Sequence, residues 1–222
     1  DGSNETTLGY LSNQGSLNNT TFIEDQAGLE AWATDSNDIG ILMKNIDLTP
    51  DTNPISLNDN KIFNGNGYTI KIGLNSLVDG KRFHTGLFSV DTEGYTITVK
   101  NLMINTENVN LINQFNAVLF KRFSDNNLNI TVENCGCDKK NGTTTLLDDS
   151  GSIVGSFANS SGTDIVIRNC FSNLNINGNG SGGIVGHKAG DSGGSFQIHN
   201  CFTTGYITAK RAGGIIGRLA SG

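Results

Sequence analysis

Short segments in which apolar and polar residues alternate recur along the chain. Three of them end in an asparagine followed by a cysteine, and they begin at Ile130, Ile165 and Phe196. A fourth segment, which begins at Ile97, has Leu102 in the position of the cysteine. Alternation with a period of two predicts β-strands that each bury one face.

A second series of short motifs, rich in glycine and bulky apolar residues, has the same spacing. Its members are the segments 86–89, 118–121, 152–155, 183–186 and 214–217. Successive members lie 32, 34, 31 and 31 residues apart, and the asparagines of the first series lie 33, 35 and 31 residues apart. Because the spacings of the two motif series vary in parallel around one period, they indicate an internal repeat.

Each repeat contains short β-branched runs separated by Gly, Asn and Ser, without helical periodicity between them. One such unit is too small to bury a core, whereas stacked units place their strands in parallel sheets. The fold class predicted is therefore all-β, a right-handed parallel β-helix with about 31–35 residues per coil. Successive coils are expected to rise by about 4.8 Å.

Stacking places equivalent residues directly above one another. One inward-facing column is expected to contain Leu102, Cys135, Cys170 and Cys201. The asparagines that precede these residues are expected to form a ladder in which each side-chain amide bonds to the next coil, and they are Asn101, Asn134, Asn169 and Asn200. Such a ladder satisfies polar groups of the turn that would otherwise lose their water.

The four cysteines are read mainly as core residues, because a reduced cysteine packs as a small hydrophobe. Neighbouring members of the column also lie within the range of a disulfide between coils, which is the alternative. Cys137 stands outside the column and is expected on a turn. The Cys135-Gly-Cys137 spacing lacks the two-residue spacer of zinc and redox pairs, so no metal site is predicted there.

The N-terminal region has a different pattern. Residues 1–21 are polar and are predicted to be an extended arm or linker. Leu29 and Trp32 then share one face of a short helix, within 22–38, that is expected to cap the open end of the core. Glu24 and Asp25 are expected in the first turn of that helix.

The β-helix domain is predicted to span 22–222, with its first coils in 39–85 and the repeats in 86–222. The chain stops directly after a strand of the second series. We therefore expect either further coils in the natural protein or contact of this edge with another chain.

The segment 193–217, with Asn200-Cys201 followed by Gly213-Gly-Ile-Ile-Gly217, resembles a GLUG repeat. A second copy covers 162–186, and the resemblance is degenerate over 86–150. GLUG repeats occur in large surface-exposed and secreted proteins, including the non-catalytic trunks of bacterial immunoglobulin A proteases and adhesin-like proteins. The resemblance implies a structural role outside the cell.

Composition and charge narrow the choice of partners. The 29 glycines and 30 asparagines are the residues that most readily adopt left-handed turns. A net charge of −6 argues against binding to nucleic acid. The longest apolar stretches are too short to insert into a membrane. No cofactor is predicted.

Candidate chemistry is sparse. Asp148 and Asp149 form the one adjacent acidic pair among the repeats. Their loop is predicted to bind a cation or another ligand weakly at most. No metal site and no catalytic residue are predicted. A charged outer column just before the ladder is expected to be solvated or to pair between coils, and it consists of Lys100, Glu133, Arg168 and His199. His199 is expected to point outward.

The function predicted is a non-catalytic structural or adhesive section of an extracellular, cell-surface or virion-surface protein. It would act as a rigid stalk whose loops attach to a host-surface glycan or protein, with homo-oligomer contacts through the N-terminal arm or the C-terminal edge. One alternative is a polysaccharide lyase or hydrolase, which would need several carboxylates and basic residues on one outer sheet. The other is a self-assembling trimeric fibre segment.

Overall fold

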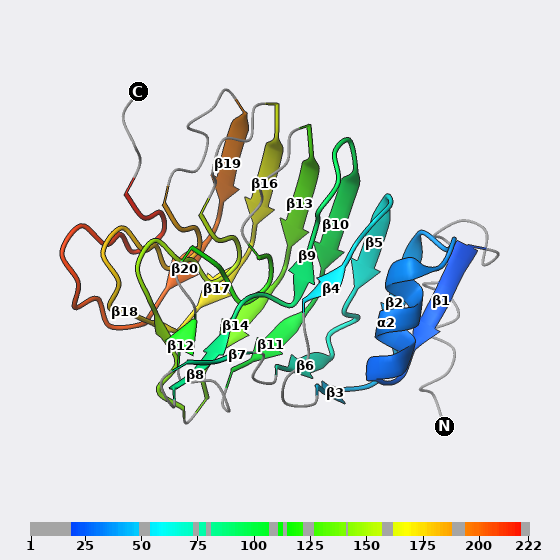
Figure 1. Cartoon of the computed structure of the whole chain (residues 1–222), viewed down its shortest axis with the longest axis horizontal. Coiled ribbons are helices and arrows are strands. Elements are labelled where there is room, and N and C mark those ends of the chain that lie inside the picture. Colours follow the sequence, from blue (N-terminus) through cyan, green and yellow to red (C-terminus); the bar gives the residue numbers. More distant parts are fainter. Residues whose placement is uncertain are drawn as a thin grey trace.

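Strands from successive coils lie side by side and parallel in the computed structural model of the chain (Figure 1). The structure describes residues 19–48, 54–72, 76–78, 81–106, 111–112, 115–121, 127–140, 142–156, 162–187 and 194–218. Together the sheets and one short helix form a parallel β-solenoid, which confirms the predicted all-β parallel stack.

The largest sheet contains seven strands, all paired in parallel. In spatial order they are β1 (Thr20–Ile23), β2 (Ile39–Leu42), β5 (Lys61–Asn64), β10 (Thr96–Lys100), β13 (Asn129–Glu133), β16 (Asp164–Arg168) and β19 (Ser195–His199). Ile130 pairs with Ile97 on one side and with Ile165 on the other. The register therefore follows the repeat that the sequence predicted.

The second sheet contains six strands, and it runs on directly from the first after one turn in most coils. Its members are β3 (Ile46–Asp47), β6 (Thr69–Lys71), β11 (Met103–Asn105), β14 (Gly136–Asp138), β17 (Phe171–Ser172) and β20 (Phe202–Thr203). Alternate side chains again point inward, so that Ile70, Ile104 and Cys137 lie in one buried column.

The remaining strands close the coils. They are β7 (Ser76–Val78), β8 (Lys81–His84), β12 (Leu111–Ile112), β15 (Thr145–Leu146) and β18 (Asn175–Ile176) in one sheet, and β4 (Ile55–Ser56) with β9 (Phe88–Ser89) in another. Only β7 and β8 pair antiparallel among the named strands. The second series of motifs forms a line of parallel bridges from Phe88 through Val154 and Val185 to Ile216.

The interior is filled by buried apolar side chains along the whole stack. Toward the N-terminal end a run of aromatic rings occupies it. The ring centroids of Trp32 and Phe63 lie 5.4 Å apart, those of Phe63 and Phe88 lie 5.6 Å apart, and those of Phe88 and Phe120 lie 6.0 Å apart. These pairs add edge and tilted contacts to the burial of large apolar surfaces.

Helix α2 (Gln26–Thr34) lies at the N-terminal end of the stack (Figure 1). Leu29 and Trp32 are both fully buried, as the sequence predicted for a capping helix. The Asp25 carboxylate accepts a hydrogen bond of 2.8 Å from the Gly28 amide. Asp25 is therefore the N-cap, and the expectation that Glu24 and Asp25 lie in the first turn is wrong because the helix begins one residue later.

Strand β1 begins at Thr20, so the ordered sheet starts two residues before the predicted domain boundary at 22. The rest of the predicted arm, residues 1–18, lies outside the described residues. Pairing with β2 explains the difference, because a polar strand can join a sheet when its backbone finds a partner.

Lys61 attaches the cap to the stack. Its ammonium group is buried in the seven-stranded sheet and donates to the carbonyls of Trp32, Asp35 and Asn37 at 3.1, 2.9 and 2.8 Å. These carbonyls belong to the last turn of α2 and the residues after it, where a cation complements the helix dipole. The sequence analysis did not predict this contact, because Lys61 is not part of either repeated motif.

Candidate functional site

The predicted asparagine ladder is present at the end of the seven-stranded sheet. Each side-chain Nδ2 donates to the Oδ1 of the asparagine one coil earlier, over 3.0 Å from Asn134 to Asn101, 3.1 Å from Asn169 to Asn134 and 3.3 Å from Asn200 to Asn169. Asn101 donates in turn to Asn64 over 3.1 Å. The ladder is thus one rung longer than the four residues identified from the sequence.

Asparagine suits this position for two physical reasons. The four predicted rungs have backbone φ angles between 51° and 54°, in the left-handed region that asparagine tolerates better than most residues. The amide also carries both a donor and an acceptor, so one side chain can bond to the coils on both sides. One N–H of each amide remains without a partner among the described residues.

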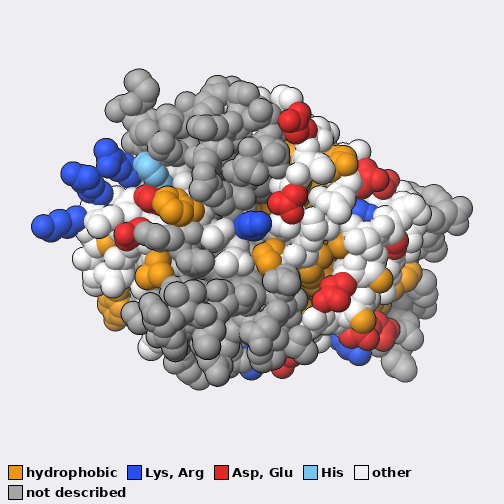
Figure 2. Space-filling model, in the orientation of Figure 1, with side chains coloured by type: hydrophobic (Ala, Val, Ile, Leu, Met, Phe, Trp, Pro, Cys, Tyr) orange, Lys and Arg blue, Asp and Glu red, His pale blue; other side chains and the backbone are white. Residues whose placement is uncertain are grey.

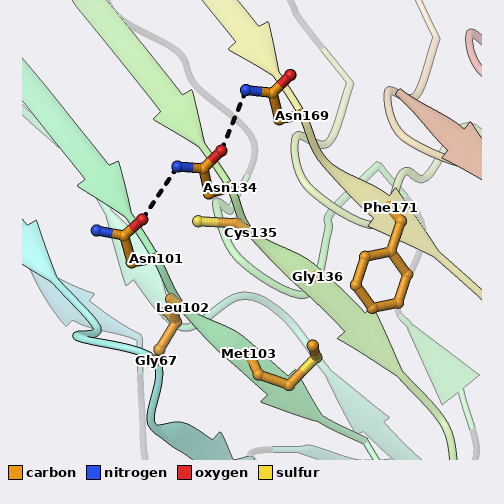
Figure 3. Close-up of a pocket in the computed structure, with 9 residues that line it drawn as sticks. All are labelled: Gly67, Asn101, Leu102, Met103, Asn134, Cys135, Gly136, Asn169 and Phe171. Atoms are coloured by element: carbon orange, nitrogen blue, oxygen red, sulfur yellow. Dashed lines mark hydrogen bonds between the residues drawn. The ribbon is translucent and has the colours of Figure 1, made fainter. Parts of the chain in front are cut away.

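A groove with a volume of about 370 Å³ runs beside the ladder, on the outside of the turn that joins the first two sheets (Figure 3). It is lined by Gly67, Asn101, Leu102, Met103, Asn134, Cys135, Gly136, Asn169 and Phe171. In Figure 3 the three asparagines form one side, and Met103 and Phe171 lie on the other.

The apolar side of the groove comes from an outward-facing column of the second sheet. Met103 pairs in register with Gly136, and Gly136 with Phe171, which is followed by Phe202. A Cβ atom at Gly136 would overlap the Phe171 ring, so the lack of a side chain there lets the ring lie over β14. Phe171 and Phe202 are stacked with ring centroids 5.5 Å apart.

None of the nine residues that line the groove is charged. The nearest outward column of the first sheet holds Lys100, Glu133, Arg168 and His199 in register, as predicted. Within it, Arg168 Nη2 and Glu133 Oε2 form an ion pair of 3.0 Å. In Figure 2, several Lys and Arg side chains project at the end that carries the last coil, and carboxylates are scattered over the whole face, including that end.

The cysteine column lies directly behind the ladder. Cys135 and Cys170 are buried, Cys201 is half-buried, and all the cysteines are free thiols, as the reduced-core reading predicted. The hydrogen bond with the Cys135 thiol and burial raise the pKa of Cys170 to about 12. The hydrogen bond with Cys170, together with burial, raises the pKa of Cys201. These thiols therefore stay protonated at neutral pH.

The prediction that Cys137 lies on a turn is wrong. Cys137 is in β14, fully buried, with its Sγ 3.6 Å from the carbonyl of Ser152. The turn ends at Cys135. By strand alternation, position 136 then lies on the outer face of the sheet, and the Cys137 side chain points into the core. Burial raises the pKa of its thiol.

The Asp148–Asp149 loop is held by protein contacts. Asp148 Oδ1 accepts from the Asn179 amide at 2.7 Å, and Asp149 Oδ1 lies 3.4 Å from His187 Nδ1. Sequence reasoning missed the pairing of Asp149 with His187, because neither residue recurs in the repeats. Among the described residues no group of three or more His, Cys, Asp or Glu side chains is placed to hold a metal ion.

Among the described side chains, His199 takes no part in such a cluster. His199 is exposed, as predicted, with Nε2 3.4 Å from the Gln197 side-chain oxygen. The side chain of His84 lies outside the described residues. No helix in the described part of the chain is long and apolar enough to cross a membrane.

These features define a parallel β-solenoid with a neutral groove along one turn. No family model matches the chain and no curated protein matches it, so the GLUG resemblance stays a prediction. The fold is similar to a solved structure from Bacteroides ovatus described as a putative immunoglobulin A1 protease, with a TM-score of 0.58 and 22% identity. The match covers 90% of this chain and 62% of that one, so this chain spans under two thirds of its length. At this identity the likeness shows the fold alone.

Proposed function

We propose that the chain is a non-catalytic, rigid section of an extracellular protein that holds an attachment surface away from its anchor. The observation that carries the proposal is the uninterrupted stack, in which parallel backbone pairing, the asparagine ladder and the thiol column repeat from coil to coil. In such a stack each coil contacts only its neighbours, so length and stiffness come from repetition.

The arrangement of charges supports a role without catalysis. A β-helix that cleaves polysaccharide would need clustered carboxylates on an outer sheet. The charged column on the outer face of the first sheet holds one carboxylate, Glu133, and Arg168 pairs with it.

A cleavage assay tests the proposal. The purified chain is incubated with neutral and acidic polysaccharides and with immunoglobulin A1, and the products are followed by reducing-end assay and gel electrophoresis. We expect no cleavage above a heat-denatured control, while an unrelated depolymerase run in parallel cleaves its substrate. Cleavage that is lost on Glu133→Gln would overturn the proposal in favour of the enzyme alternative.

Sedimentation of the same sample tests the fibre alternative. A monomer at all concentrations supports a stalk that carries its stiffness within one chain. A stable trimer would favour the self-assembling segment instead, with contacts through an end of the stack.

A further inference from the structure

We propose that the groove beside the asparagine ladder binds a neutral, extended oligosaccharide that runs along the axis of the stack. This inference rests on the proposed function, because it names the ligand class that the attachment surface would take. Three features of the groove support it: the amides of the ladder, the apolar side chains opposite them, and the absence of charged residues in the lining.

The polar side of the groove matches the chemistry of sugar hydroxyls. Each amide of Asn101, Asn134 and Asn169 uses one N–H and one lone pair of its oxygen within the ladder. Each rung therefore keeps a donor and a lone pair. A hydroxyl group, which both donates and accepts, can use both without breaking the ladder.

The spacing of these groups favours an extended glycan over a single sugar. Neighbouring rungs repeat with the rise of the coils, about 4.8 Å. This is close to the length of one pyranose unit in an extended β-1,4-linked chain. Successive sugars of such a chain are turned over by half a rotation, so every second sugar can meet every second rung in the same way.

The apolar side supplies what the C–H faces of a pyranose ring require. The Phe171 ring lies over Gly136 and is stacked on Phe202, which is 55% exposed. Met103 continues the same column toward the N-terminal end. The groove is open to solvent, its lining combines one aromatic ring with three amides, and its volume falls within the usual range of ligand sites.

The charge of the groove selects against anionic glycans. No lining residue is charged, and the adjacent Arg168 guanidinium is engaged by Glu133 at 3.0 Å. A carboxylate or sulfate that entered the groove would lose water without gaining a cationic partner among the lining residues, because the cations Lys100 and Arg168 belong to the flanking column of the first sheet. The ligand class is therefore neutral.

Calorimetric titration with cellotetraose, and with tetragalacturonate as the charged counterpart, tests the proposal on the whole chain. We expect saturable binding of cellotetraose and none of tetragalacturonate. In parallel, ¹⁵N-resolved NMR should shift the side-chain amide signals of Asn134 and Asn169 on addition of cellotetraose. Binding without these shifts would overturn the assignment of the groove.

Two variants locate the binding. Phe171→Ala should weaken cellotetraose binding by about tenfold, equivalent to roughly 1.4 kcal/mol. Met103→Ala should weaken it less, because a flexible thioether is replaced and no ring is lost. Phe22→Ala is the matched control, because Phe22 is 44% exposed on β1 at the far end of the seven-stranded sheet. This variant should bind cellotetraose as tightly as the parent chain does.

The outcomes separate this inference from the proposed function. If no neutral tetrasaccharide of glucose, mannose or N-acetylglucosamine binds at millimolar concentration, the groove proposal fails while the non-catalytic stalk stands. Equal binding by the folded Phe171→Ala chain would also overturn it. Cleavage of the titrated oligosaccharide would instead overturn the proposed function.

Discussion

At the scale of single residues, the asparagine rungs combine a backbone requirement with a side-chain requirement. Asn134 has a φ of 52°, donates to Asn101 and accepts from Asn169. Most L-residues cost roughly 1–2 kcal/mol in this left-handed conformation, whereas glycine adopts it freely. The two contributions can therefore be separated by substitution.

Asn134→Gly should lower the free energy of unfolding by about 1 kcal/mol, because it removes the ladder bonds but keeps the backbone conformation. Asn134→Ala should cost a further 1–2 kcal/mol, roughly the strain of a left-handed alanine. Urea denaturation of both variants measures the difference. Equal stability of the two would show that backbone strain is not part of the requirement.

Lys61 acts at the same scale through its buried ammonium group. Lys61→Met should lower the free energy of unfolding by about 3 kcal/mol, since it leaves three carbonyls at the end of α2 without their donor. Lys44→Met is the control, because Lys44 is exposed and its ion pair with Glu24 spans 3.9 Å. Such surface pairs contribute at most about 1 kcal/mol. Thermal unfolding followed by Trp32 fluorescence compares the stability of the Lys61→Met and Lys44→Met variants.

At the scale of elements, close approach of neighbouring coils decides where glycine is required. A Cβ atom at Gly183 would overlap the Gly214 carbonyl oxygen, whereas one at Gly214 would lie 3.7 Å from its nearest neighbour, Thr203 Oγ1. The two glycines occupy equivalent positions of the second motif series, one coil apart. They form a matched pair for the same substitution.

Gly183→Ala should destabilise the fold by about 2 kcal/mol, because the backbones of adjacent coils must separate. Gly214→Ala should leave stability unchanged within about 0.5 kcal/mol. Chemical denaturation of both variants gives the comparison. A loss of similar size in both would mean that coil spacing does not set the glycine requirement.

The thiol column gives the stack a dependence on alkaline pH. The pKa of Cys170 rises from its ordinary value of 9.0 to about 12, so the unfolded chain loses this proton at a lower pH than the folded chain. The folded state then holds more protons, and stability falls as pH rises above 9. Below that pH the contribution is fully present.

We expect the urea midpoint, measured with a reductant present, to fall more steeply between pH 9 and about 12 for the parent than for a Cys170→Ala, Cys201→Ala double variant. Tyrosine and lysine titrate in the same range in both chains, so the difference isolates the thiols. Parallel curves for the two chains would contradict this reading.

At the scale of the whole molecule, the two ends of the stack differ in protection. The N-terminal strand β1 is covered by α2, and its Ile23 is fully buried. The last strand β19 pairs on one side with β16, and its Phe196 and Ile198 are half-buried. In a solenoid such differences stay local, because each coil interacts with its neighbours only.

Hydrogen exchange followed by mass spectrometry should therefore show amides of β19 exchanging faster than those of β13, which is paired on both sides. Amides of β1 should exchange more slowly than those of β19, although both strands lie at an end of the sheet. Uniform exchange along the stack would indicate that the chain unfolds as one cooperative unit.

The sequence was most informative where contacts repeat. Rungs such as Asn134 and Asn169, and thiols such as Cys135 and Cys170, were identified from spacing because in a stack the contact partner lies one period away. The same logic failed for Cys137 and for Lys61. The burial of Cys137 depends on the residue at which a turn ends. The Lys61 ammonium group contacts helix α2, which is not part of the repeat.

The sequence by itself determined the class of fold, the length of the coil and four of the five residues of the ladder, because each follows from a periodic pattern of side chains. Only the tertiary structure decided that an outer groove lies beside the ladder. The groove depends on Gly136 lying beneath the Phe171 ring, a contact between neighbouring coils. It also decided that His187 meets Asp149, since neither residue repeats and their contact depends on how far each loop extends.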